Sequence, residues 1–437
     1  MAQPVSSATP FISPKAIISS YYSPTFYRVR GIVSLAFGGG IIYQSNSNGD
    51  LQVKTFQLNA KWLFGGGIAC ALFGVFSLGA TAPRAKTAQE LAGSSLGEVR
   101  KCEGAGDFRK GLQMARKGQE QFAKLGLATE AQQFEQMAKR LEDKLLTEGF
   151  SKILFDDTQK PRIKFVKLLE VVRMPALDAT QNPIDQIDAW AQKNLLRPAD
   201  TTRWDLQVGE FEKLEGEIKP IVAELGFLNE VLPSFQKYEG ALVLGASLPA
   251  VRNRVNFLVK QWETGVRFSN LYFLTGERDL DPKLESNLDL VSDQRSSLKI
   301  RKDWKRPEEI NFPKTEREMI ELVWNQADLP KGMRELSVHF INAPKIANSD
   351  PKKVKPPRTC ETVESWLATN PPTGSYLVIS NAPYINRQDL TVRSLSPKAF
   401  KFDTVGEAAH KNEKVAIILD EIGRTIFETR KITQKKS

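Results

Sequence analysis

Polar and charged residues follow several short apolar runs in the second half of the chain, where buried strands are expected to end. They lie directly after an apolar run or in the next predicted helix: Gly245, Ala246, Arg254, Gly276, Glu277, Ser380, Asn381 and Arg387. If the runs are parallel strands, these residues gather at one edge of a sheet, because ligands bind outside the carboxyl ends of such strands. The positions therefore define a candidate ligand-binding site.

The residue types at these positions favour an anionic ligand. Gly245 and Gly276 permit tight turns and a close approach of backbone to ligand. A helix that follows a strand directs free N–H groups and its positive dipole end at the same crevice. Arg254 and Arg387, each expected in a first helical turn, offer paired donors to a phosphate or carboxylate. We therefore expect a small anionic ligand, phosphorylated or nucleotide-like.

The elements that must position these residues alternate between strand and helix. Apolar runs at 241–244, 270–275, 336–341, 375–380 and 401–405 predict strands, with helices at 252–264, 315–327, 359–369, 387–395 and up to 429. Such alternation predicts an α/β fold, a doubly wound, mostly parallel Rossmann-like sheet over residues 236–437. The polar insert 277–314 is long for a compact domain, which favours a flap over the site or a solvated loop.

Two of the predicted helices carry capping signals at their first residues. Thr315 precedes Glu318 by three positions, the spacing of a capping box, and Glu316 favours the positive end of the helix dipole. Thr359 similarly opens the next helix. Capping alone explains these residues, and a ligand role for Glu316 needs more than its position.

Composition and charge limit the other functions. The chain has 437 residues, 41% of them hydrophobic, which indicates two or three globular domains. Its 61 basic and 51 acidic residues leave a net charge of +10, but no basic block with interleaved aromatics stands out, so we do not expect nucleic-acid binding. Three cysteines without ligand spacing and two histidines disfavour a disulfide scaffold, a metal site and histidine-based catalysis.

The first part of the chain is apolar in places, and the middle is helical. Residues 1–86 read as a mobile tail followed by apolar stretches at 31–43 and 62–82, of which 62–82 has the length of a transmembrane span. Flanking basic residues leave its orientation open, and a buried glycine-rich hairpin is the alternative. Residues 87–235 show helical periodicity and predict an α-helical domain. We therefore expect membrane association, with a soluble cytoplasmic protein as the alternative.

The order of motifs in the C-terminal domain resembles the SanA/YdcF-like family, also called ElyC-type. The segments that carry the resemblance are GALVLGA, RVNFLVKQWETG, YFLTG, TEREM, INAP, RTCET and LVISNAPYINRQ. It covers about residues 240–429. The resemblance implies a Rossmann-like domain of bacterial envelopes whose pocket is lined by Gly245, Arg254, Gly276, Glu316, Thr359, Ser380 and Arg387.

The chain also departs from the pattern of that family. Pro383 and Tyr384 stand where the family usually has a histidine, and Thr362 replaces an asparagine. The missing histidine favours binding over catalysis, so no catalytic residue is predicted. The family implies cell-envelope maintenance and, as a further alternative, S-adenosylmethionine binding with Glu277 at the ribose; no other cofactor is indicated. A different class of function is a membrane-anchored interaction protein whose α/β domain is not catalytic.

Overall fold

The computed structural model describes residues 35–36, 39–45, 51–56, 88–197, 209–292, 298–308, 311–347 and 355–434. By its internal contacts the chain divides into two compact units, Met1–Leu91 and Ala92–Ser437. Each unit is described by itself, and the candidate site lies in the second.

The first unit contains a small antiparallel sheet. Its strands are β1 (Leu35–Ala36), β2 (Gly39–Ser45) and β3 (Leu51–Phe56), and β2 pairs with both neighbours. Part of the apolar stretch 31–43 is therefore strand rather than helical hairpin, consistent with its β-branched and aromatic residues Ile41, Ile42 and Tyr43. The predicted span 62–82 lies outside the described residues. Among the helices that are described, none has the length and apolar character needed to cross a membrane.

Three helices follow, α2 (Ala88–Gly104), α3 (Phe108–Lys124) and α4 (Ala128–Glu148). Helices α3 and α4 form a helical hairpin, with Gly126 at φ +72° in the turn between them. The Asp107 side chain caps α3 by accepting from the Lys110 amide at 3.3 Å. Buried Phe108, Phe122 and Phe134 belong to a core that these helices share.

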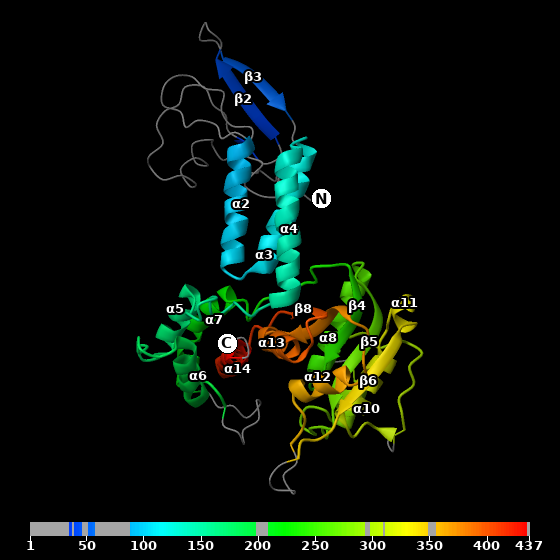
Figure 1. The fold of residues 1–437 in the computed structure, drawn as a ribbon. Helices are drawn as coiled ribbons and strands as arrows, with labels where there is room; N and C mark the ends of the chain where they lie inside the picture. The colour runs from blue at the N-terminus through cyan, green and yellow to red at the C-terminus, as the bar shows by residue number, and fades with distance from the viewer. Residues whose placement is uncertain are drawn as a thin grey trace, which may run out of the picture. The chain divides into compact units, whose positions relative to one another are not determined.

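The next helices share a core with the C-terminal helix. They are α5 (Ile163–Val171), α6 (Pro183–Asn194), the short 3₁₀ helix η3 (Glu210–Leu214) and α7 (Glu215–Glu224). Helix α14 (Val415–Gln434) buries Val415, Ile418, Ile422 and Ile426 against them. In Figure 1, α14 (red) lies between α6 (green) and α13 (orange), in agreement with the contacts of both. The helical region thus packs against the end of the chain as well as against itself.

The predicted parallel α/β architecture is confirmed. Strands β4 (Lys237–Leu244), β5 (Arg267–Gly276), β6 (Ser337–Ala343), β7 (Gly374–Asn381) and β8 (Phe400–Glu407) form one sheet, in the order β6-β5-β4-β7-β8. All neighbouring pairs are parallel, and Figure 1 shows β4, β5 and β6 side by side. The order runs one way from β4 to β6 and the other way to β8, so it reverses between β4 and β7.

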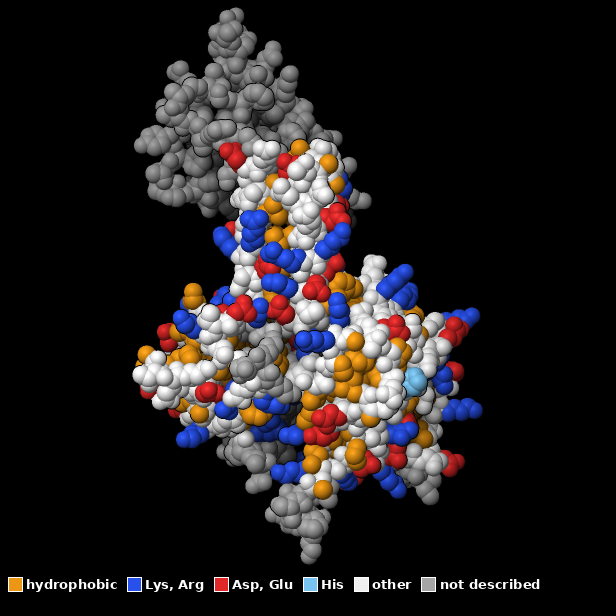
Figure 2. Space-filling view, viewed as in Figure 1, with side chains coloured by type: hydrophobic (Ala, Val, Ile, Leu, Met, Phe, Trp, Pro, Cys, Tyr) orange, Lys and Arg blue, Asp and Glu red, His pale blue; other side chains and the backbone are white. Residues whose placement is uncertain are grey.

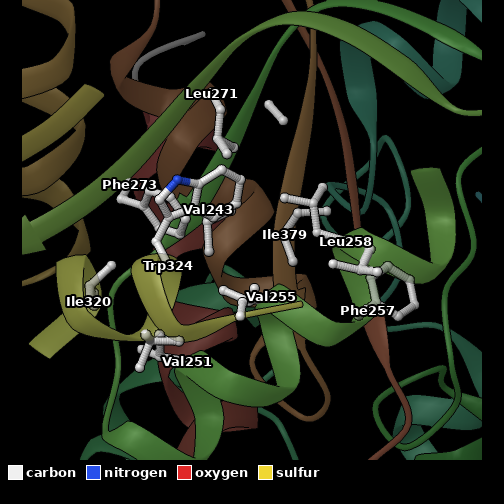
Figure 3. Close-up of a cluster of buried hydrophobic side chains, with 14 of the residues drawn as sticks. Val243, Val251, Val255, Phe257, Leu258, Leu271, Phe273, Ile320, Trp324 and Ile379 are labelled. Atoms are coloured by element: carbon white, nitrogen blue, oxygen red, sulfur yellow. The ribbon is translucent and has the colours of Figure 1, made fainter. Parts of the chain in front are cut away.

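Alternate strand residues supply two separate cores, one on each face of the sheet. Val243, Phe273 and Ile379 pack with residues of α8 (Leu248–Glu263) and α10 (Glu316–Gln326), as Figure 3 shows. Their neighbours Leu244 and Leu274 point to the other face, where α12 (Thr359–Leu367) and α13 (Ile385–Leu395) add to the core. This burial on both faces explains why the strands read as continuous apolar runs.

Shorter elements complete the fold, and one helix begins earlier than predicted. Helices α9 (Asn287–Val291) and α11 (Lys331–Arg334) lie in the connections on either side of α10. The predicted capping box of α10 is confirmed between Thr315 and Glu318. Helix α8 begins at Leu248, after Ser247 and with Pro249 in its first turn, so Arg254 stands in the second turn. The prediction that Arg254 lies in the first turn of this helix was wrong.

Candidate functional site

A pocket of about 660 Å³ lies at the carboxyl ends of β4 and β5, beside the reversal of strand order. Leu244 and Leu274, near the ends of these two strands, line it. Its other walls come from α12, α13 and α14 and from residues 278–285. Open α/β sheets bind ligands at this location, and the volume is in the range of small-molecule sites.

The predicted site residues divide into two groups. Four of them line the pocket: Gly245, Glu316, Thr359 and Arg387. Six lie outside its lining: Ala246, Arg254, Gly276, Glu277, Ser380 and Asn381. Two residues of the second group contact the first group directly: Arg254 donates to the Gly245 carbonyl, and the Gly276 amide donates to Glu316.

Arg387 lies in the first turn of α13, where it was predicted, and faces the pocket. Its Nε donates to Glu421 Oε2 at 2.6 Å, and Glu421 on α14 is fully buried. Among the described residues, no hydrogen-bond partner lies on the two terminal nitrogens of Arg387. The buried ion pair therefore fixes the side chain while leaving two parallel donors for a ligand.

Gln388 follows Arg387 and also lines the pocket, although only 5% of the residue is exposed. Its Oε1 accepts a short hydrogen bond from the Ser380 hydroxyl, which fixes the amide orientation. The Nε2 group has no partner among the described residues. Ser380 thus acts through Gln388, which adds a further donor beside Arg387.

Arg254 does not reach the pocket. Only 2% of the residue is exposed, and its Nη1 donates to the carbonyls of Leu244 at 2.6 Å and Gly245 at 3.0 Å. Its Nε and Nη2 donate to Asn381 Oδ1 at 3.0 and 2.8 Å. The guanidinium therefore ties the end of β4 to the end of β7. Arg254 and Asn381 are structural supports of the pocket edge.

The two strand-end glycines make room for other parts of the chain. A Cβ on Gly245 would lie 2.7 Å from the Leu274 carbonyl and 2.9 Å from Glu316 Oε1. A Cβ on Gly276 would clash with the ring of Pro357. Other groups therefore approach both glycines closely, as expected, but these groups are the Glu316 carboxylate and the Pro357 ring of this chain rather than a ligand.

Glu316 occupies the space between these two strand ends. Its Oε2 accepts from the Gly276 amide at 3.0 Å, and its Oε1 lies 3.7 Å from Arg278 Nη2. Burial raises the pKa of this carboxyl above its usual range, although Arg278 and the Gly276 amide act in the opposite direction. A raised pKa widens the pH range in which the protonated carboxyl can donate to a ligand oxygen, and the ionised carboxylate can accept from a hydroxyl or an amine.

The anion site at the start of α8 is filled by the chain itself. Glu285 is 3% exposed, and its carboxylate accepts from the Leu248 amide at 3.1 Å and from the Asp281 amide at 2.7 Å. Arg278 donates to the two oxygens of Glu285 at 2.8 Å each and to the Ala246 carbonyl at 3.3 Å. Residues 278–285 therefore form a fixed wall. Trp304, which belongs to the insert 277–314, is not among the residues that line the pocket.

Glu277 lies in a second hollow of about 510 Å³, together with Asp279, Thr315, Glu318 and Asn342. One Glu277 oxygen accepts from the Lys345 amide at 3.1 Å. The residue is therefore separate from the group that includes Arg387. This placement gives no support to a ribose contact from Glu277 within the first pocket.

Helix α12 contributes its first turn to the pocket, including Thr359 and Cys360. Burial and a hydrogen bond to Glu361 raise the pKa of the Cys360 thiol to about 11. The neutral thiol therefore predominates at neutral pH, which argues against a nucleophilic role. Arg358 binds the Glu361 carboxylate at 2.7 Å, so this pair holds the start of the helix.

Sequence reasoning missed the contribution of α14. Arg424, Phe427 and Glu428 line the pocket, yet they lie far along the chain from any strand end. Arg424 donates to both oxygens of Asp420, at 2.9 and 3.2 Å. Spacings of three and four residues place the three side chains on one face of the helix. That spacing can be read from the sequence, but it does not show that this face of α14 lines the pocket.

The charges that line the pocket balance in number but are distributed unevenly. Residues 278–285 and α10 contribute one arginine and four carboxylates, whereas Arg197, Arg358, Arg387 and Arg424 stand with Glu428 on the other side. Basic and acidic side chains are likewise interspersed on the molecular face that Figure 2 shows. Within the described ranges, no cluster of three or more His, Cys, Asp or Glu side chains is placed to hold a metal ion.

Comparisons with known proteins do not assign the chain to a family. Scans of protein-family models, of curated proteins and of solved structures each find no match to it.

Proposed function

We propose that the α/β part of residues 92–437 binds a small anionic molecule, phosphorylated or nucleotide-like, in the pocket at the ends of β4 and β5. The observation that carries this proposal is the arrangement of Arg387 and Gln388. Both side chains are held by buried partners, Glu421 and Ser380, and both keep donor nitrogens without partners among the described residues. Fixed donors in a partly desolvated pocket favour an anion, because little conformational entropy is lost when it binds.

Two further observations support an anion on this side of the pocket. Arg278 has its donors directed to Glu285 and Ala246, so this arginine is already paired, and the wall at residues 278–285 has more carboxylates than cations facing the pocket. Arg424, in contrast, is bound by one carboxylate on its own helix and is a third exposed. An anion therefore gains most between Arg387, Gln388 and Arg424, with Glu316 positioned for a hydroxyl or amine elsewhere on the ligand.

Wider aspects of the function rest on the sequence. The order β6-β5-β4-β7-β8 with helices on both faces supports a Rossmann-like assignment. The motif order supports kinship with the SanA/YdcF-like family and a role at the cell envelope. The apolar segment 62–82 supports membrane association of the whole protein. We include all three in the proposal, and S-adenosylmethionine stays an alternative ligand.

Thermal-shift measurements on the full chain test the binding proposal. The probes are inorganic phosphate, glucose 6-phosphate, AMP and S-adenosylmethionine, each compared with sodium chloride at equal ionic strength. We expect at least one phosphate compound to raise the Tm, and we expect Arg387→Lys to abolish most of that rise. Lysine keeps the charge beside Glu421 but lacks the paired donors.

Arg430→Lys is the matched control. Arg430 lies on α14 and forms ion pairs, as Arg387 on α13 does, but it does not line the pocket. It binds Asp185 and Asp188 at 2.6 and 3.0 Å. This variant should keep the ligand-induced rise even if its own Tm falls. Equal rises in the wild-type chain and in Arg387→Lys, or no rise with any probe, would contradict the proposal.

A further inference from the structure

Phe427 is an exposed aromatic side chain in a pocket rich in charged groups. Of the residue, 39% is exposed, and its side chain belongs to the lining. The other large hydrophobic residues that are exposed within the described ranges are aliphatic and lie outside the pocket: Leu125, Ile163, Leu232 and Leu288. An aromatic surface at this place differs from a hydrophobic residue scattered on the surface.

The fold does not need the Phe427 ring for its core. Helix α14 buries Ile418, Ile422 and Ile426 against α5–α7, and Phe427 is not part of that cluster. The Lys431 ammonium lies 5.3 Å from the centre of the ring. Lys431 thus covers part of the ring, and the side chain still has exposed area and lines the pocket, where it can stack with a flat ring of a ligand.

The position of Phe427 relative to the arginines defines the ligand further. Arg424 precedes it by three residues on α14, so the two side chains are neighbours on the helix surface. Arg387 reaches the same helix through its ion pair with Glu421, three residues before Arg424. Anion donors and an aromatic surface thus follow one another along one face of α14, and Glu316 lines the same pocket.

From this arrangement we infer that the ligand carries an aromatic ring in addition to its anionic group, as nucleoside monophosphates do. The ring stacks on Phe427, and the phosphate binds Arg387 and Arg424. The inference rests on the proposed function and narrows its ligand class. Stacking on one aromatic side chain increases affinity by about tenfold or more per base.

Calorimetric titration of the full chain tests the inference with ligands that differ only in the ring. AMP and UMP carry a base, and ribose 5-phosphate carries the same sugar phosphate without one. We expect AMP or UMP to bind about tenfold more tightly than ribose 5-phosphate. Phe427→Leu should reduce this difference to about threefold or less, Phe427→Trp should restore it, and ribose 5-phosphate should bind all three proteins alike.

A matched control separates this result from a general effect of exposed hydrophobic residues. Leu288→Ala removes a side chain that is 71% exposed and outside the pocket, and it should leave every affinity unchanged. Equal affinities for AMP, UMP and ribose 5-phosphate, or an unchanged preference in Phe427→Leu, would overturn the inference while the proposed function stands. Absence of binding by all three compounds and by inorganic phosphate would overturn both.

Discussion

Two strand–helix junctions at the same edge of the sheet carry similar residues and perform different tasks. Strand β4 is followed by Gly245 and by α8, which carries Arg254, whereas β7 ends at Asn381 and is followed by α13, which carries Arg387. Arg254 is buried and donates to two carbonyls and to Asn381. Arg387 uses one nitrogen for Glu421 and presents the others to the pocket.

The difference arises from what else lies at each junction. The start of α8 is occupied by Glu285, and the space beside Gly245 is occupied by Glu316. At the start of α13, the neighbouring α14 supplies a buried carboxylate that holds Arg387 from one side only. An arginine near a helix start is therefore available to a ligand when a buried carboxylate binds only one of its nitrogens. It is structural when backbone carbonyls and a side-chain amide use its donors.

The largest expected effect is the loss of stability when the arginine after β4 is replaced by lysine, compared with the same replacement after β7. Arg254→Lys removes most of four hydrogen bonds to buried acceptors, and we expect it to lower the free energy of unfolding by about 3 kcal/mol. Arg387→Lys keeps an ion pair with Glu421 and should lose less than about 1 kcal/mol. Urea denaturation of the two variants measures both values.

The comparison also makes a prediction about binding. Arg387→Lys should have nearly the Tm of the wild-type chain without ligand, but its Tm should no longer rise when ligand is added. Arg254→Lys should have a lower Tm without ligand, and its Tm should still rise when ligand is added. Equal destabilisation by the two substitutions would remove the distinction between a structural arginine and a binding arginine.

Much of the architecture could be predicted because it depends on local pattern. Apolar runs ending in glycine gave strands at the correct places, and the capping box at Thr315 and Glu318 was readable from spacing. The rule for parallel sheets also located the pocket edge. Gly245, Glu316, Thr359 and Arg387 reach the pocket because they lie close in sequence to that edge.

What could not be predicted depends on contacts between distant segments. Arg254 and Arg387 look alike in sequence, and only the positions of Asn381 and Glu421 separate their roles. The contribution of Phe427 and the shared core of α14 with α5–α7 depend on how the last helix packs. No local pattern carries that information, since each helix surface has several faces that a neighbour can cover.

A smaller effect is expected from filling the space beside Gly245. Gly245→Ala places a Cβ against the Leu274 carbonyl and Glu316 Oε1, and should lower the free energy of unfolding by about 1–3 kcal/mol. Gly216→Ala is the control, because a Cβ at that position in α7 meets no atom within 4 Å. It should stabilise the helix by about 0.5–1 kcal/mol. A harmless Gly245→Ala would show that Glu316 does not occupy this junction.

The smallest effect concerns the pH dependence of two glutamates on α10. Burial raises the pKa of Glu316, whereas backbone hydrogen bonds and the capping contact with Thr315 lower that of Glu318. The folded state therefore favours protonated Glu316, so its contribution to stability is present at acidic pH and is lost as pH rises through its raised pKa. Glu318 acts in the opposite direction, because its contribution is present above the ordinary glutamate pKa and is lost as pH falls.

Glutamine substitutions at the two positions should therefore differ in sign. In Glu316→Gln, the amide oxygen can still accept from the Gly276 amide. The free energy of unfolding of this variant, relative to the wild-type chain, should therefore increase from about pH 4 to about pH 8, the range that begins near the ordinary glutamate pKa. In Glu318→Gln, stability relative to wild type should decrease as pH rises from about 3 to about 5, the window around and below the ordinary glutamate pKa. Thermal unfolding from about pH 3 to about pH 8 measures both trends. If Glu316→Gln follows the same trend as Glu318→Gln, then Glu316 is charged and solvated in the fold. The junction after β4 would then be accessible to a ligand, as the junction after β7 is.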